Sequence, residues 1–122
     1  MGDLVFRIPV APSVNELYYN APGKGRRKTE RYRGWFVVAR NAMRYEGNKA
    51  RTWPTIAGPA AVEIICNPRG DIDNRLKGTL DLLVDMSVIK DDSLFHDVRI
   101  TRGGSAKEAI VTVRELTQPG AA

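Results

Sequence analysis

Residues 61–85, AVEIICNPRGDIDNRLKGTLDLLVD, decide the fold. The first six residues put an apolar side chain at every second position, which predicts a half-buried strand whose inward face carries Val62, Ile64 and Cys66. Pro68 and Gly70 end this strand. From Asp73 to about Asp85 the apolar residues recur every three or four positions, which predicts a helix whose core-facing side chains are Leu76, Leu80, Leu83 and Val84. This stretch is therefore a strand that leads directly into a helix.

The flanking sequence supplies four more elements. Residues 4–10 alternate as a strand does, and residues 29–46 have the apolar spacing of an amphipathic helix. Two further strands are expected over 97–102 and 109–116, as the arms of a hairpin around Gly103-Gly104-Ser105. The order strand, helix, strand, helix, strand, strand predicts an α/β (α+β) fold. We expect one small domain over residues 1–122, with a mixed sheet of about four strands packed with two helices and a flexible tail over 117–122.

Length and composition exclude several classes of protein. A chain of 122 residues has room for one domain. The single cysteine, Cys66, excludes an internal disulfide framework, and the single histidine, His96, excludes any site that needs two. No apolar run approaches the roughly 18 residues that span a membrane, so we expect a cytoplasmic protein with no membrane partner. The formal charge of +5 favours a polyanionic partner.

The densest run of positive charge lies in a segment rich in glycine and proline. We expect a mobile basic loop over about residues 20–31, where Pro22, Gly23 and Gly25 accompany the cations Lys24, Arg26, Arg27 and Lys28. Such a loop can contact phosphates, and unpaired bases can stack on the tyrosines nearby, which are Tyr18, Tyr19 and Tyr32. Contact with about six phosphates would make log affinity fall with log salt at a slope of roughly −5. The alternative is a solvated loop without a ligand.

Acidic residues gather around the predicted helix. Asp71 and Asp73 lie two residues apart where the strand gives way to the helix, and Asp91-Asp92 follows the turn after it. The helix itself carries one polar stripe beside its apolar face, made of residues four apart: Asp73, Lys77 and Asp81. Adjacent carboxylates repel unless a cation shares the site, and oxygen ligands alone suit a hard ion such as Mg²⁺. The alternatives are helix capping, a surface ion pair and turn residues.

The chemistry that this arrangement favours is metal-assisted hydrolysis of a phosphodiester. A metal ion held by carboxylates lowers the pKa of a bound water and screens the charge that builds in the transition state. An ammonium group such as that of Lys77 can stabilise the same charge. We expect products with 5′-phosphate and 3′-hydroxyl ends.

Together these motifs resemble the RusA family of Holliday-junction resolvases, which is found in bacteria and their prophages. The resemblance covers about residues 4–116 and rests on Pro12-Ser13-x-Asn15, Tyr18-Tyr19, Asp71-x-Asp73-Asn74-x-x-Lys77, Asp81 and Asp91-Asp92. One departure is Ala11, which stands where the family usually has a second proline.

The resemblance implies a homodimeric, Mg²⁺-dependent endodeoxyribonuclease, with Mn²⁺ as a substitute and no organic cofactor. It would nick two opposed strands of a four-way DNA junction in recombination and repair, in the nucleoid of a bacterial or phage-infected cell. The catalytic set that it implies is Asp71, Asp73, Asp92, Lys77 and Asn74. The same three carboxylates would bind the metal, with Asp91 as an additional candidate and Asp81 as a helper. The residues expected to contact DNA are Ser13, Asn15, Tyr18, Tyr19, Lys24, Arg26, Arg27, Lys28, Arg69 and Arg75.

The predicted helix over residues 29–46 has an aromatic face. Its residues Tyr32, Trp35 and Phe36 could form a dimer interface as well as the core of one chain.

Two other functions fit the same residues. A basic protein that binds branched DNA without cutting it would keep the acids as part of its scaffold, and it predicts no loss on Asp73→Asn. A nuclease for flaps, D-loops or RNA would use the same acids, since no residue indicates contact with a 2′-hydroxyl.

Overall fold

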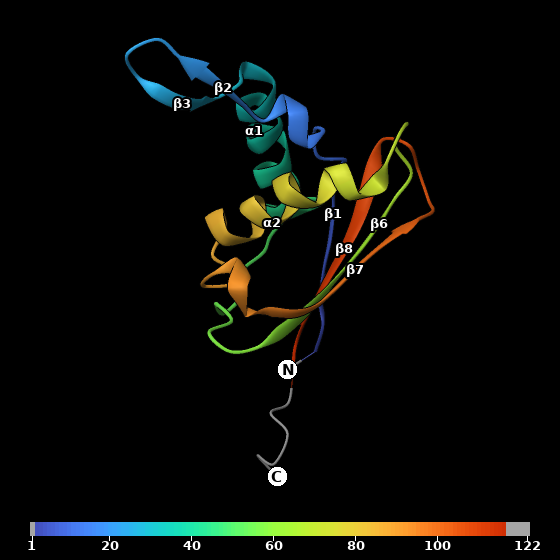
Figure 1. Ribbon diagram of the computed structural model, residues 1–122. Coiled ribbons are helices and arrows are strands. Elements are labelled where there is room, and N and C mark those ends of the chain that lie inside the picture. The colour runs from blue at the N-terminus through green and yellow to red at the C-terminus, as the bar shows by residue number, and fades with distance from the viewer. Residues whose placement is uncertain (1, 117–122) are drawn as a thin grey trace.

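Four strands form the mixed sheet that the sequence predicts, in the computed structural model of this chain (Figure 1), which describes residues 2–116. They are β1 (Leu4–Pro9), β6 (Ala60–Cys66), β7 (Phe95–Arg102) and β8 (Glu108–Glu115), and their order in the sheet is β1-β8-β6-β7. β6 and β7 run parallel, while β8 is antiparallel to both β1 and β6. The tail expected over 117–122 lies outside the described residues.

The last two strands are not the arms of one hairpin, and that part of the prediction was wrong. β6 lies between β7 and β8 and pairs with both. Directly after β7, the amide of Gly103 donates a hydrogen bond to the carbonyl of Cys66 at the end of β6, with an N–O distance of 3.0 Å. A glycine-rich turn shows that the chain changes direction, but it does not specify the neighbouring strand. The strand with the most buried residues, β6, takes the central position, where both of its edges are paired.

Two helices cover one face of this sheet (Figure 1): α1 (Glu30–Arg44) and α2 (Leu76–Asp85). The hydroxyl of Thr29 caps α1 by accepting a hydrogen bond from the amide of Tyr32, at 3.1 Å. The aromatic face of α1 is buried within the single chain, so it belongs to the core and leaves no aromatic surface for a dimer. No helix among residues 2–116 is long and apolar enough to cross a membrane.

α2 is the connection that joins the parallel strands β6 and β7. Two parallel neighbouring strands need such a crossover, because the chain must return to the end of the sheet at which the first strand began. The helix was predicted to begin at Asp73, but the chain first makes a 3-10 turn, η2 (Ile72–Arg75), and α2 begins at Leu76. A second 3-10 turn, η3 (Asp92–Leu94), leads into β7. The acidic residues therefore lie at the two ends of this crossover.

The expected basic loop is a β-hairpin. β2 (Tyr18–Ala21) pairs antiparallel with β3 (Gly25–Lys28), and a 3-10 turn, η1 (Val14–Glu16), precedes it. The hairpin projects from the body of the molecule beside α1 (Figure 1). Gly23 and Gly25 adopt positive φ angles of 71° and 74°, which L side chains rarely adopt and which let the chain reverse. A second, two-residue hairpin follows α1, in which β4 (Tyr45–Glu46) pairs with β5 (Lys49–Ala50).

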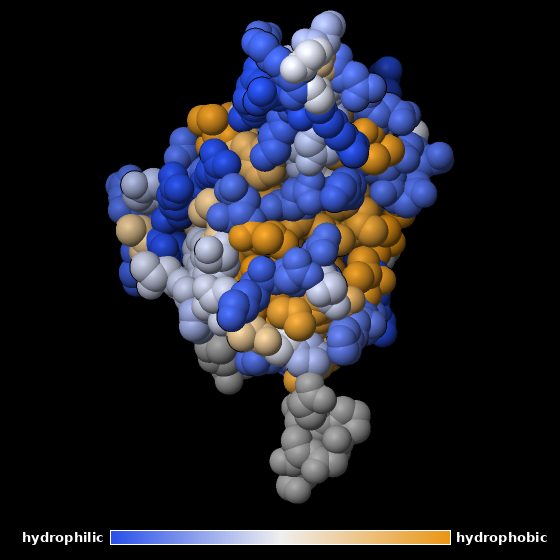
Figure 2. All heavy atoms as spheres, turned by 60° about the vertical axis from the view of Figure 1, so that its left-hand side comes forward, coloured by the Kyte–Doolittle hydropathy of each residue, from blue (hydrophilic) through white to orange (hydrophobic). Residues whose placement is uncertain are grey.

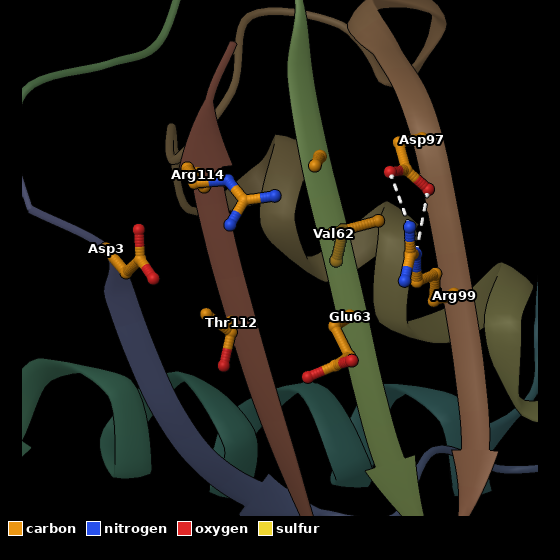
Figure 3. A pocket seen from close by; sticks show the side chains of 8 residues that line it. Asp3, Val62, Glu63, Asp97, Arg99, Thr112 and Arg114 are labelled. Atoms are coloured by element: carbon orange, nitrogen blue, oxygen red, sulfur yellow. Dashed lines mark hydrogen bonds and ion pairs between the residues drawn. The ribbon is translucent and has the colours of Figure 1, made fainter.

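The face of the sheet opposite the helices has no covering element among residues 2–116. Figure 3 shows a shallow hollow on this face, with Asp3, Glu63, Thr112 and Arg114 around it and the ion pair of Asp97 and Arg99 at its side. Its lining mixes both signs of charge. It contains none of the acidic residues at the two ends of α2.

Candidate active site

Of the three residues of the predicted polar stripe, Lys77 and Asp81 lie on α2, whereas Asp73 lies in the preceding turn η2. The ammonium of Lys77 and the carboxylate of Asp81, one turn apart, form an ion pair with an Nζ–Oδ1 distance of 3.2 Å. About half of the Lys77 side chain is exposed, and Asp81 is more deeply placed, at 22%. The hydrogen bond from Lys77 to Asp81 and the negative charge of Asp81 raise the pKa of Lys77, so the lysine is a cation at neutral pH.

Asp81 is the centre of a larger group of hydrogen bonds. Its Oδ2 atom accepts from the hydroxyl of Tyr32 at 2.7 Å and from the hydroxyl of Tyr18 at 3.2 Å. Burial and the contact with Asp81 raise the pKa of both phenols, which therefore remain hydrogen-bond donors. The sequence does not predict this role for Tyr32, because the residue fits the apolar spacing of α1. Its polar hydroxyl, on a side chain expected in the core, was the signal that could have revealed a buried partner.

Asp71 and Asp73 lie where η2 begins, next to the end of β7. Arg102, in the last position of β7, donates hydrogen bonds to the carbonyls of Pro68 at 2.7 Å and Gly70 at 2.6 Å. These bonds fix the loop that carries Asp71, a role of Arg102 that no sequence motif predicts. Both carboxylates are exposed, and neither enters a hydrogen bond or ion pair with another side chain among residues 2–116.

Asp91 and Asp92 lie at the other end of α2. Asp91 accepts hydrogen bonds from the amide and the hydroxyl of Ser93, which lower the pKa of its carboxyl. Asp92 is exposed, and its charge contributes to the raised pKa of Lys77. Both residues line an open hollow together with Tyr18, Lys28, Phe36, Asp81, Val84 and Asp85.

The structure does not bring the predicted carboxylates together within one chain. α2 has 10 residues, which corresponds to a length of about 15 Å. Asp71 and Asp73 precede α2 in the chain, and Asp91 and Asp92 follow it. Within residues 2–116, no three His, Cys, Asp or Glu side chains are grouped closely enough to hold one metal ion.

The donors at the start of η2 nevertheless fit a hard cation. Asp71 and Asp73 offer unengaged carboxylate oxygens, the ligand type that Mg²⁺ prefers. Mg²⁺ retains several waters and takes only one or two protein carboxylates, so a complete protein cage is not required. Asn74 is half-buried and directly follows Asp73 in the chain.

The tyrosines and cations of the hairpin divide between its two faces. Tyr18 pairs with Lys28 across the strands, and Tyr19 pairs with Arg27. Because successive side chains of a strand point to opposite faces, the two tyrosines point apart. The outer face forms an open hollow lined by Tyr19, Ala21, Pro22, Lys24, Arg27 and Arg33. Hydrophilic side chains gather over this part of the molecule, uppermost in Figure 2.

The remaining candidates for DNA contact have different environments. Ser13 and Asn15 lie at η1, where Asn15 is exposed and Ser13 half-buried. Arg69 is exposed in the loop after β6. The guanidinium of Arg75 instead donates to the carbonyls of Ala11 at 3.1 Å and Arg69 at 3.2 Å, so it is engaged in holding the backbone of this region.

A comparison with protein-family models matches residues 9–114 of the 122-residue chain to Endodeoxyribonuclease RusA. The chain belongs to the RusA family. It is thus an endodeoxyribonuclease of the class that resolves Holliday junctions. A comparison with individual curated proteins gave no match.

The RusA match contains every element that contributes to the candidate site. It begins at the end of β1 and ends within β8, so it includes the β2–β3 hairpin and the whole crossover from β6 to β7. The acids at both ends of α2 and the basic hairpin are therefore parts of one family domain.

Proposed function

We propose that this RusA-family protein is an Mg²⁺-dependent nuclease that resolves four-way DNA junctions by paired nicks. The observation that carries this proposal is the ion pair of Lys77 and Asp81 on α2, which follows the exposed acids of η2 and contacts the basic hairpin through Tyr18. Basic side chains attract the DNA polyanion, whereas exposed carboxylates near them would repel its phosphates. A metal ion bound by both the carboxylates and a DNA phosphate would remove this repulsion.

The chain's own residues would divide the chemistry among them. Asp71 and Asp73 would hold Mg²⁺, or Mn²⁺ in its place, with Asp92 as a third carboxylate. The bound ion would lower the pKa of a water molecule and so supply the nucleophile. The Lys77 ammonium would stabilise negative charge on the phosphate in the transition state. Asn74 would orient a phosphate oxygen or a water through its amide, and the expected ends are a 5′-phosphate and a 3′-hydroxyl.

We infer from the position of Asp92 that two copies of the chain would share each active site. Asp92 follows α2 in the chain, whereas Asp71 and Asp73 precede it, and no three His, Cys, Asp or Glu side chains among residues 2–116 are grouped closely enough to hold one metal ion. A two-fold axis across the middle of α2 would place the first turn of one helix beside the last turn of its partner. Each site would then take Asp71 and Asp73 from one subunit and Asp92 from the other. A dimer would carry two such sites, in keeping with two nicks in a two-fold junction.

The hairpin would supply the contacts to DNA around these sites. Lys24, Arg27 and Arg33 line the same open hollow as Tyr19 on the outer face of the hairpin, and no acidic residue lines it. This combination suits a nucleotide, because the cations bind its phosphate and the ring stacks on its base. Arg26 and Lys28, on the opposite face, lie over aromatic rings of the core.

The test is cleavage of a labelled four-way junction by the wild-type protein and by Asp73→Asn, with Mg²⁺ and with EDTA. Asp85→Asn is the matched control, because Asp85 is an acid of α2 that pairs with Arg40. We expect paired symmetric nicks with wild type and with Asp85→Asn, and a loss of at least about 100-fold with Asp73→Asn or EDTA. Junction binding without nicks under any divalent metal would instead support the binding protein. Equal cleavage of flaps or RNA would support a broader nuclease.

A further inference from the structure

We propose that Asp81 is a positioning residue for Lys77, and that Tyr18 and Tyr32 hold Asp81 in place so that the basic hairpin and the lysine are mechanically connected. This inference rests on the proposed catalytic role of Lys77. It assigns no direct contact between Asp81 and the substrate.

The two oxygens of Asp81 have separate partners. Oδ1 accepts from the ammonium of Lys77 at 3.2 Å, while Oδ2 accepts from both tyrosine hydroxyls, at 2.7 Å and 3.2 Å. A carboxylate held on one oxygen by two phenols cannot rotate freely, so the other oxygen presents a fixed acceptor to the lysine. A long, half-exposed lysine side chain would otherwise sample many rotamers.

Tyr32 is the rigid half of this clamp. Its side chain is fully buried, and its ring packs against Phe36 and Trp35 with ring centroids 4.7 Å and 6.1 Å apart. The residue belongs to α1, whereas Asp81 belongs to α2, so the short hydrogen bond between them also fixes one helix against the other.

Tyr18 is the half of the clamp that belongs to the hairpin. It is the first residue of β2, and the guanidinium of Arg26, on β3, lies 4.1 Å from the centre of its ring. DNA that draws Arg26 or the hairpin toward a phosphate would shift the Tyr18 hydroxyl relative to Asp81. Substrate binding on the hairpin can therefore reach Lys77 through one hydrogen bond and one ion pair.

Asp85 shows that this arrangement is not general along α2. It lies one turn after Asp81 and makes a simple ion pair with Arg40 of α1, at 2.8 Å. Asp85→Asn is therefore a matched control, since it removes the same charge from the same helix without touching Lys77.

A double-mutant cycle in single-turnover cleavage of the junction tests the inference. We expect Asp81→Asn to lower the rate about 10- to 100-fold, Tyr18→Phe to lower it several-fold, and Asp85→Asn to leave it unchanged, all with unchanged affinity for the junction. In a Lys77→Ala background, Asp81→Asn should have no further effect. The same fold loss from Asp81→Asn with and without Lys77 would overturn the inference, because it would show a role independent of the lysine.

A second measurement does not depend on nuclease activity. Lysines labelled with ¹³C-methyl groups are titrated by NMR, and the signal of Lys77 is assigned by its loss in Lys77→Ala. The groups that act on Lys77 are Asp81, Tyr18 and Asp92. We expect the Lys77 signal to titrate at a lower pH in Asp81→Asn and at an unchanged pH in Asp85→Asn. An unchanged titration in Asp81→Asn would overturn the inference, whereas a wild-type protein that never cuts DNA would refute only the proposed function.

Discussion

Tyr18 and Tyr19 are neighbours in the sequence, but they have opposite roles in the structure. The Tyr18 ring has the guanidinium of Arg26 over it and packs edge-to-face with the ring of Tyr32, and its hydroxyl donates a hydrogen bond to Asp81. The Tyr19 side chain is 49% exposed in the hollow that contains Lys24, Arg27 and Arg33. Of the two, only Tyr19 presents a ring that a base can stack on without disturbing Asp81.

Replacing Tyr19 by alanine should weaken binding to a junction with unpaired bases at its centre. A base stacked on an aromatic ring contributes about 1–3 kcal/mol, so we expect Kd to rise roughly 5- to 150-fold, measured by fluorescence anisotropy. Tyr45→Ala is the control, because Tyr45 is equally exposed, at 54%, but lies on β4, outside the hairpin. Equal effects of the two substitutions would argue against a stacking role for Tyr19.

At the scale of the element, α2 approaches the N-terminal part of the chain through a glycine. A Cβ atom placed on Gly78 would lie 3.1 Å from Cβ of Ala11, which is itself buried. Tyr32 and Leu17 close the remaining space, at 3.6 Å and 3.7 Å. The absence of a side chain at this position therefore lets α2 lie close to the segment that carries Ser13 and Asn15.

Two glycine-to-alanine changes test this close packing. Alanine is favoured over glycine in a helix by about 1 kcal/mol, and Gly34 on α1 has nothing within 4 Å of an added Cβ. Gly34→Ala should therefore raise the free energy of unfolding by up to about 1 kcal/mol in urea denaturation. Gly78→Ala should lower it by about 1–3 kcal/mol, because the added methyl group overpacks the core. A stabilising Gly78→Ala would show that α2 is free to move away from Ala11.

At the scale of the whole molecule, the sequence predicts the elements better than their arrangement. Periodicity locates both helices and all four strands of the sheet, since each depends on residues close in sequence. It does not show that β6 separates β7 from β8, because the order of strands depends on which edges pair in three dimensions. It also misses the β2–β3 hairpin, whose strands are short and charged instead of alternating.

The same limit applies to the candidate site. The spacing of Lys77 and Asp81 predicts their pairing, because one helical turn separates them. Asp73, predicted to share their stripe, lies in the 3-10 turn η2 before the helix begins. The contacts of Asp81 with two tyrosines from distant segments have no local signature. The sequence also does not show that Asp71 and Asp92 lie at opposite ends of α2. The residues of a turn that follows a helix do not reveal how far that turn lies from the start of the helix.

Mixing inactive variants tests most directly whether two copies of this chain share each active site, as we propose. Asp73→Asn and Asp92→Asn carry different tags, are co-expressed, and are purified as the mixed dimer for cleavage of a labelled four-way junction. In the mixed dimer, one site would combine both substitutions and the other would combine two native sets of carboxylates.

We therefore predict that each variant alone is inactive and that the mixed dimer nicks one strand per junction, at up to about half of the wild-type rate for the first nick. Mixed dimers as inactive as the two parents would contradict the shared site and would place all three carboxylates of a working site in one chain.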